Sequence, residues 1–395
     1  MIDFSYVPIE ELNRFRSRAM AAGTIGILSI VAGAFINPAQ FFHSYLLGYI
    51  FWLGLTVGCM AVLMLHHLSG GGWGIGIRRI SEAATQTFPL LFLLFLPLLF
   101  GRRFLYAWTR PEDVVHSDLL QHKTAYLNLQ FFSARLVIYF AVWIVLSHFL
   151  NKWSAEQDRN ADPGITRRMQ TLSGPGLVLF GLTVTFASID WVMSLDPEWF
   201  STMFGLAFME GQALTGLAFV IAVSALLSQH QPLCRVISSE HFHDLGKLLL
   251  AFVMIWAYLA FSQFLIIWSG NLPEEIPWYV RRLQGGWQWV GLVLVLFHFA
   301  LPFLLLLSRD LKRNARTLAN VAWAVILMRL VDLFWLTAPQ PGTGGFRVHW
   351  MDLAAPVGIG GLWLAIFFGR LVRRPLLALN DPEFKEILAH AGESH

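Results

Sequence analysis

Residues 44–67 read SYLLGYIFWLGLTVGCMAVLMLHH, an apolar run without Asp, Glu, Lys or Arg. A helix needs about 20 apolar residues to cross the roughly 30 Å hydrocarbon core of a bilayer, so this run is long enough to span it. Nine other stretches have the same character. The sequence therefore predicts an all-α polytopic membrane protein, a single integral membrane domain over residues 1–395 with ten transmembrane helices. The predicted spans are 19–36, 44–67, 82–100, 131–150, 172–194, 201–228, 245–269, 286–308, 315–337 and 350–371.

The composition agrees with a membrane protein and excludes several other classes. Hydrophobic residues make up 56% of the 395 positions and charged residues 13%, whereas soluble domains carry roughly 25% charged residues. The net charge of +3 is too small to indicate a nucleic-acid binder. The two cysteines, Cys59 and Cys234, cannot supply the ligands of an iron–sulfur cluster or attach a covalent haem, and no metal site is predicted.

The distribution of basic residues predicts the orientation of the chain. Most of the 28 Lys and Arg side chains fall in the two terminal segments and in the loops on the same side of the membrane. By the positive-inside rule both termini are expected to be cytoplasmic, and the long 101–130 loop is expected to lie outside. The opening MIDFSYVPIEEL lacks the basic region of a secretory signal, so the first helix is expected to stay in the membrane.

A weak internal repeat suggests how the spans are grouped. Asp190 and Asp332 each lie seven residues before a proline, Pro197 and Pro339. This match predicts two related four-helix bundles, formed by spans 2–5 and 6–9 and flanked by spans 1 and 10. Gly and Pro are common in membrane helices, so coincidence is the alternative interpretation. Two glycine pairs share a six-residue interval and support the repeat, namely Gly48–Gly54 and Gly205–Gly211.

Polar and ionisable side chains within or near the ends of the predicted spans give the strongest functional signal. A charge at the bilayer centre costs roughly 3 kcal/mol on insertion scales, so such groups normally face a partner or a wet cavity. Titratable groups joined by hydroxyls can relay protons, and we interpret the set as a proton path. Its candidate residues are Glu210, His298, Asp190, Asp332, Arg329, Arg135, Tyr139, His148, His66, Lys247, Tyr258 and Ser262.

The expected depths of these residues order them along the path. His66, His148 and Lys247 lie toward the cytoplasm, where protons would be taken up, and His298 and Glu210 are the expected central carriers. Histidine suits a carrier because its unperturbed pKa is near 6.5. Tyr258 and Ser262 would continue the uptake half, and the release half would pass the remaining four charged residues, Asp190, Arg135, Asp332 and Arg329.

Several of these residues also fit simpler interpretations. Arg329 and Asp332, three residues apart on one helix face, equally fit a neutralised pair that fixes helix packing. His66 equally fits an interfacial position at a helix end. Trp191 is compatible with lipid-facing bulk or with an apolar quinone slot.

Several polar loop strings resemble a known family. They are similar to the F-type membrane subunit of bacterial alternative complex III, a quinol:electron-acceptor oxidoreductase, within the NrfD-like (polysulfide reductase membrane subunit) family. The resemblance runs from about residue 14 to 375. The strings that carry it are Asp118-Leu-Leu-Gln-His-Lys123, Tyr126-Leu-Asn-Leu-Gln-Phe-Phe132, Trp143 with Ser154-Ala-Glu-Gln-Asp158, Ser188-Ile-Asp-Trp-Val-Met-Ser-Leu-Asp-Pro-Glu-Trp199 and Asn271-Leu-Pro-Glu-Glu-Ile-Pro-Trp-Tyr279.

The resemblance implies a role, partners and a location. It implies a non-catalytic subunit of the bacterial inner membrane that couples quinol oxidation to proton translocation and is able to bind a quinone, menaquinone or ubiquinone. The implied partners are a sister NrfD-like quinol-binding subunit, a periplasmic iron–sulfur subunit and cytochrome c subunits. Haem and iron–sulfur clusters would then sit only in these partners.

Three other classes remain open from the sequence. A b-type cytochrome needs two histidines at equal depth on facing helices, and His148 and His298 are the only deep candidates. A secondary transporter would show broken helices near the midplane. A purely structural membrane anchor would carry its buried charges only to fix the packing of its own helices.

Overall fold

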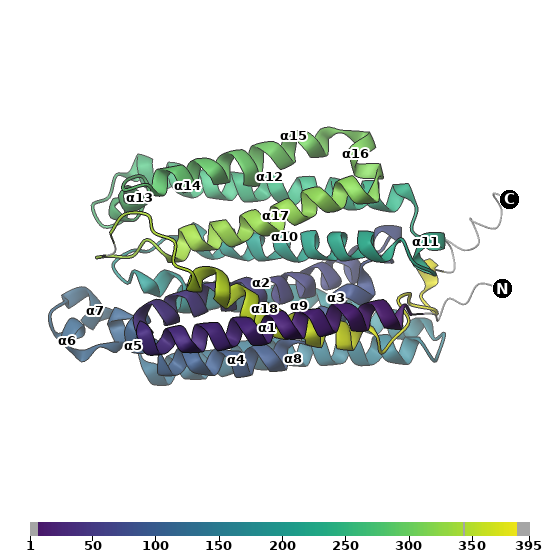
Figure 1. Cartoon of the computed structure of the whole chain (residues 1–395), viewed down its shortest axis with the longest axis horizontal. Coiled ribbons are helices and arrows are strands. Elements are labelled where there is room, and N and C mark those ends of the chain that lie inside the picture. The colour runs from purple at the N-terminus through teal and green to yellow at the C-terminus, as the bar shows by residue number, and fades with distance from the viewer. Residues whose placement is uncertain (1–6, 343, 385–395) are drawn as a thin grey trace.

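The computed structural model describes residues 7–342 and 344–384, and all regular structure in this part of the chain is helical (Figure 1). Within these described ranges, nine helices are long and apolar enough to cross a membrane, and one bent pair, α3 with α4, makes a tenth span. The predicted all-α, ten-span membrane fold is therefore confirmed. The spans are α1 (Ile9–Ile36), α2 (Pro38–Ser69), α3 (Arg78–Thr85) with α4 (Phe88–Phe100), α8 (Leu129–Gln157), α9 (Pro163–Trp191), α10 (Thr202–Leu227), α12 (Ser239–Gly270), α14 (Trp287–Val293) with η4 (Leu294–Ala300) and α15 (Leu301–Leu307), α17 (Ala315–Thr337) and α18 (Met351–Leu371).

Short helices cap the two ends of the molecule. The end where α1 begins and α18 stops is called the terminal end here, and the opposite end the loop end (Figure 1). The predicted 101–130 loop lies at the loop end and is partly helical. The short elements are η1 (Gly72–Gly74), α5 (Arg102–Leu105), η2 (Ala107–Thr109), α6 (Pro111–Val115), α7 (Asp118–Lys123), η3 (Met193–Leu195), α11 (Leu233–Val236), α13 (Ile276–Arg282) and α16 (Arg309–Arg313).

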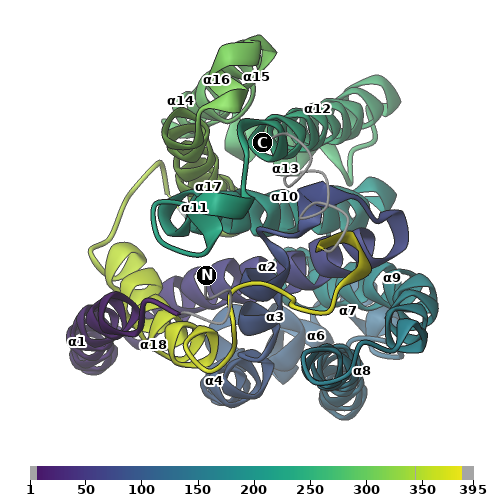
Figure 2. The same ribbon diagram turned by 90° about the vertical axis from the view of Figure 1, so that its right-hand side faces the viewer.

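The spans form two groups that meet along α2 and α10. α2, α3, α4, α8 and α9 pack together, as do α10, α12, α14–α15 and α17, while α1 and α18 lie as a pair against α2 (Figure 2). This is the predicted arrangement of two four-helix bundles with flanking first and last helices. α2 and α10 are also the most enclosed spans, with 94% and 83% of their apolar windows buried, against 22% for α1 and α12.

The predicted 82–100 span is not one straight helix, because it bends by 41° between α3 and α4. Pro89 has no N–H to donate to the Thr85 carbonyl, so the helical hydrogen-bond ladder is interrupted there. Ser147 of α8 donates its hydroxyl to that carbonyl instead, at 3.0 Å. A neighbouring span thus satisfies a backbone group that lipid cannot.

Glycines allow two helix pairs to approach closely. An added Cβ at Gly58 of α2 would lie 1.9 Å from the Gln212 backbone oxygen, and one at Gly216 of α10 would lie 2.3 Å from the Gly58 carbonyl carbon. On the flank, Gly23 of α1 faces the Gly361 backbone of α18 in the same way. Small residues at such crossings are typical of membrane helices, whose association depends on close backbone packing.

The α2–α10 contact leads to a stability prediction. Gly58→Ala adds a Cβ against fixed backbone atoms, so we expect it to destabilise the fold by about 1–3 kcal/mol or more, as overpacking does. Gly174→Ala on α9, whose Cβ would meet nothing within 4 Å, is the matched control. Thermal unfolding in detergent compares the two variants, and equal unfolding temperatures would contradict the close-contact interpretation.

Candidate functional site

A buried charged cluster in the second bundle, here called the Arg329 centre, joins four spans. Arg329 and Asp332 of α17 form an ion pair across one helical turn. The indole nitrogen of Trp256 in α12 donates to the Asp332 carboxylate at 3.2 Å. The His298 ring packs edge-on against Trp256 with ring centroids 4.3 Å apart, and Glu210 of α10 completes the cluster. Two of the predicted central carriers and the predicted pair therefore meet in one place.

Several polar atoms of the Arg329 centre lack a hydrogen-bond partner among the described residues. They are both carboxylate oxygens of Glu210, both ring nitrogens of His298, and Nε and Nη2 of Arg329. Glu210 is 7% exposed and His298 0%. Both groups interact electrostatically with Arg329. An unsatisfied buried polar group costs about 1–3 kcal/mol. Three side chains with such groups at one site therefore point to a role other than packing.

The local sequence explains how Arg329 reaches this position. An added Cβ at Gly211 would lie 2.3 Å from the guanidinium carbon of Arg329, so the guanidinium lies directly against the α10 backbone. Only a residue without a side chain leaves this space beside Glu210. Gly211 belongs to the glycine pair that suggested the internal repeat, and the structure gives it a specific packing role.

His298 lies in a π-helical segment, which sequence analysis did not predict. The spans 286–308 and α14–η4–α15 coincide, but Leu294–Ala300 is wound as a π-helix. Pro302 follows, and it cannot donate to the His298 carbonyl four residues earlier. Wider turns of this kind are frequent at functional sites, where they change the direction in which a side chain projects.

The first bundle holds a second charged cluster, the Asp190 centre, which is fully satisfied. Arg135 of α8 donates from Nε and Nη2 to the two Asp190 oxygens, each at 2.8 Å. The Tyr139 hydroxyl donates to the same carboxylate at 2.7 Å, and Asp190 is 0% exposed. The Arg135 guanidinium also lies 3.8 Å from the ring centre of Tyr126. This bidentate, stacked geometry is typical of a structural ion pair.

Four residues of the predicted uptake half do not join either centre. His148 lies on the exposed face of α8, and Tyr258 on α12 is 68% exposed. Lys247 is exposed and pairs with Asp244 at 2.9 Å, and Ser262 is only half-buried. By helical spacing Lys247, Tyr258 and Ser262 lie on one face of α12, and in this chain that face is turned outward. The structure does not bring these residues together with either centre, so an uptake path along α12 stays a prediction.

The terminal end instead contains a buried ionic network that sequence analysis did not identify. Arg78 and Arg79 of α3 bind the Glu82 carboxylate at 2.9 and 2.7 Å, and Arg79 also pairs with Asp158. The Ser154 hydroxyl of α8 donates to Glu82 at 2.6 Å. The Arg-Arg-x-x-Glu spacing on one helix is the available signal, but both arginines lie before the start of the predicted 82–100 span.

Two titratable groups lie in or beside this terminal-end network, His66 and Asp158. His66 is 4% exposed at the end of α2, its Nδ1 has no partner among the described residues, and it interacts electrostatically with Arg78. Burial raises the pKa of the Asp158 carboxyl, just beyond α8, above its ordinary value of 3.8, although Arg79 opposes the shift. His66 is thus buried near charged side chains at the end of α2.

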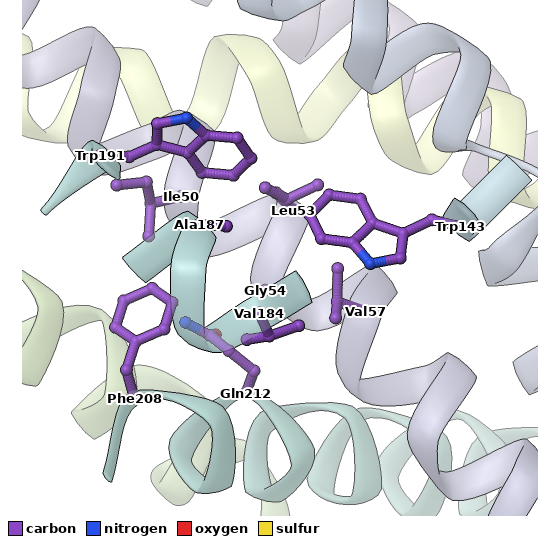
Figure 3. A pocket seen from close by; sticks show the side chains of 10 residues that line it. All are labelled: Ile50, Leu53, Gly54, Val57, Trp143, Val184, Ala187, Trp191, Phe208 and Gln212. Atoms are coloured by element: carbon purple, nitrogen blue, oxygen red, sulfur yellow. The ribbon is translucent and has the colours of Figure 1, made fainter. Parts of the chain in front are cut away.

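An apolar cavity separates the two bundles near the Asp190 centre (Figure 3). Trp191 and Trp143 line one side of it, and Phe208 and Gln212 of α10 line the other. It has room for about one water molecule, which is far less than a quinone ring occupies. Trp191 lines this small cavity, and the surrounding side chains would have to move before a quinone could enter.

Comparison with known proteins adds no assignment. No family model matches this sequence, and no curated protein matches it.

The Asp190 centre leads to a prediction about stability. Asp190→Asn leaves the Arg135 guanidinium buried without its counter-charge, so we expect a loss of about 3–5 kcal/mol. Asp113→Asn is the control, because Asp113 and Arg110 form an exposed pair and such pairs contribute at most about 1 kcal/mol. Denaturant unfolding in detergent measures both. A small effect of Asp190→Asn would show that Arg135 finds another partner and that the pair is not structural.

Proposed function

We propose that this chain is a proton-carrying membrane subunit in which Glu210 and His298 of the Arg329 centre accept and release protons. One observation carries the proposal: a carboxylate and an imidazole, both buried at membrane depth, lack hydrogen-bond partners among the described residues. Buried ionisable groups in membrane spans normally serve a path for ions or protons. The multi-pass helical fold supplies the barrier that such a path crosses.

The chemistry of the centre suits transfer of a proton between neutral and charged states. Glu210 can take up a proton and become neutral, and His298 can take one up on either free ring nitrogen. Arg329 stays positive and already shares its charge with Asp332, so each protonation step changes the local charge balance. The unpartnered Nε and Nη2 of Arg329 can then donate to whichever neighbour is negative.

We assign uptake to the terminal-end network in place of the α12 face. His66 and the Glu82–Asp158 region lie at the end where the sequence concentrates its basic residues, which the positive-inside rule places in the cytoplasm. In this proposal protons pass from that end to the Arg329 centre and leave toward the loop end. The Asp190 centre serves as a structural pair and not as a carrier.

The loop-string resemblance supports a wider proposal about the assembly. The chain would be the F-type subunit of a quinol-oxidising complex in a bacterial inner membrane. A sister NrfD-like subunit would hold the quinol, menaquinone or ubiquinone, and iron–sulfur and cytochrome c subunits would carry the electrons. Charge movement during quinol oxidation in those subunits would drive protonation changes at Glu210 and His298.

Two substitutions test the proton-carrying role in the assembly purified through this chain. Glu210→Gln and His298→Ala remove the titratable groups and are expected to lower proton translocation on the order of 100-fold, with quinol oxidation largely retained. Glu275→Gln in the loop-end segment and His148→Ala on the exposed face of α8 are the matched controls. The measurement is the number of protons released per electron transferred.

The same experiment distinguishes the alternatives. Unchanged proton-to-electron ratios in both variants would overturn the proposal and leave the chain as a structural anchor. The π-helical η4 and the bent α3–α4 pair also favour a secondary transporter, for which the chain alone should take up a substrate into liposomes. A b-type cytochrome would show a haem absorption band, but His148 and His298 lie in different bundles.

A further inference from the structure

A second cleft lies at the terminal end, apart from the Arg329 centre. One wall is a face of α3, and the other is the end of α18 with the turn that follows it, and these elements lie side by side (Figure 2). Arg79 and Gln86 line the first wall, and Arg370 and Arg374 the second, with Glu82 between them. Three guanidinium groups and one carboxylate therefore line one cleft.

The single carboxylate of the cleft is already compensated from the protein interior. Glu82 accepts hydrogen bonds from Arg78 at 2.9 Å, from Arg79 at 2.7 Å and from Ser154 at 2.6 Å. Arg374 lies farther away, 3.8 Å from the nearest Glu82 oxygen. Little of the Glu82 charge is left to balance the arginines on the α18 side.

The arginines retain donors that the described part of the chain does not use. Arg374 donates from Nη1 to the Asn151 carbonyl at 3.0 Å, and Arg370 forms no ion pair with any described residue. Arg79 is 4% exposed and its Nε has no partner among the described residues. Arg79 already pairs with Glu82 and Asp158, whereas the exposed Arg370 has no counter-charge among the described residues, so the α18 side of the cleft can take an external anion.

The chemistry and the position of the cleft indicate which anion it binds, namely the phosphate of a lipid headgroup. Guanidinium groups bind phosphate oxygens in pairs of parallel hydrogen bonds. Basic pockets between membrane helices near the headgroup level bind anionic lipid headgroups. Farther along the same bent span, Leu93 of α4 is 59% exposed and Leu96 39%, so this span offers apolar surface for acyl chains.

We propose that this cleft binds the phosphate of an anionic phospholipid from the leaflet at the terminal end. The phosphate lies between Arg370 and Arg374, with the free Nε of Arg79 at the base. The acyl chains follow the exposed face of α4. The bound lipid then supplies the counter-charge that links α18 to α3.

The test measures lipid binding to the purified full chain by native mass spectrometry. Phosphatidylglycerol is the probe and phosphatidylcholine the neutral reference. Arg370→Gln is expected to weaken phosphatidylglycerol binding about fivefold, and Arg370→Gln with Arg374→Gln about 25-fold, from the contribution of each basic residue near a membrane surface. Arg373→Gln is the matched control, because Arg373 is exposed on the same turn and does not line the cleft.

The other outcomes overturn the assignment. If Arg373→Gln weakens binding as much as Arg370→Gln, lipid is retained by overall charge and the cleft is not a site. If phosphatidylcholine binds as tightly as phosphatidylglycerol, the arginines do not recognise the negative charge of the headgroup. If excess inorganic phosphate displaces phosphatidylglycerol completely, the cleft is a site for free phosphate. Because Arg370 forms no ion pair with the described residues, Arg370→Gln is expected to fold normally.

Discussion

The backbone contact between α2 and α10 is the constraint on which the rest of the structure depends. At Gly58 and Gly216 the two helices approach until no side chain fits between them. Both helices are buried almost all round, because each packs on the spans of its own bundle and on the other helix of the pair. In lipid, where apolar surface gains little from burial against other apolar surface, such close packing is a main source of helix association.

The central position of α10 gives its two faces different environments. Glu210 and Gln212 are two residues apart and project to opposite sides of the helix. Glu210 belongs to the Arg329 centre, while the Gln212 amide lies against Gly54 of α2 and lines the apolar cavity. Phe208 also lines that cavity, and its ring centre is 5.9 Å from the Arg329 guanidinium. A movement of α10 would therefore affect both bundles at once.

The two charged centres show how the same spacing in sequence leads to different chemistry. Asp190 and Asp332 occupy matching positions before a proline, but their arginines come from different places. Asp190 is held by Arg135 of the neighbouring helix with two aligned hydrogen bonds. These bonds use the Nε and Nη2 donors on the edge of the guanidinium that faces Asp190. Asp332 is held by Arg329 of its own helix, which leaves donors free toward Glu210 and His298. The second arrangement is the one suited to changes of protonation.

The sequence by itself determined the number of spans and their approximate limits, because a bilayer requires long apolar runs and those runs are visible without coordinates. The grouping into two bundles was only suggested by a weak repeat. It also identified Glu210, His298, Arg329 and Asp332, because charges in apolar runs are rare. Only the tertiary structure decided which of these groups meet. Helical spacing shows that Lys247, Tyr258 and Ser262 share a face, but not that this face is turned outward. The network around Glu82 and the π-helical turn at His298 depend on contacts between distant spans, and a periodic pattern carries no information about which neighbour a helix face will meet.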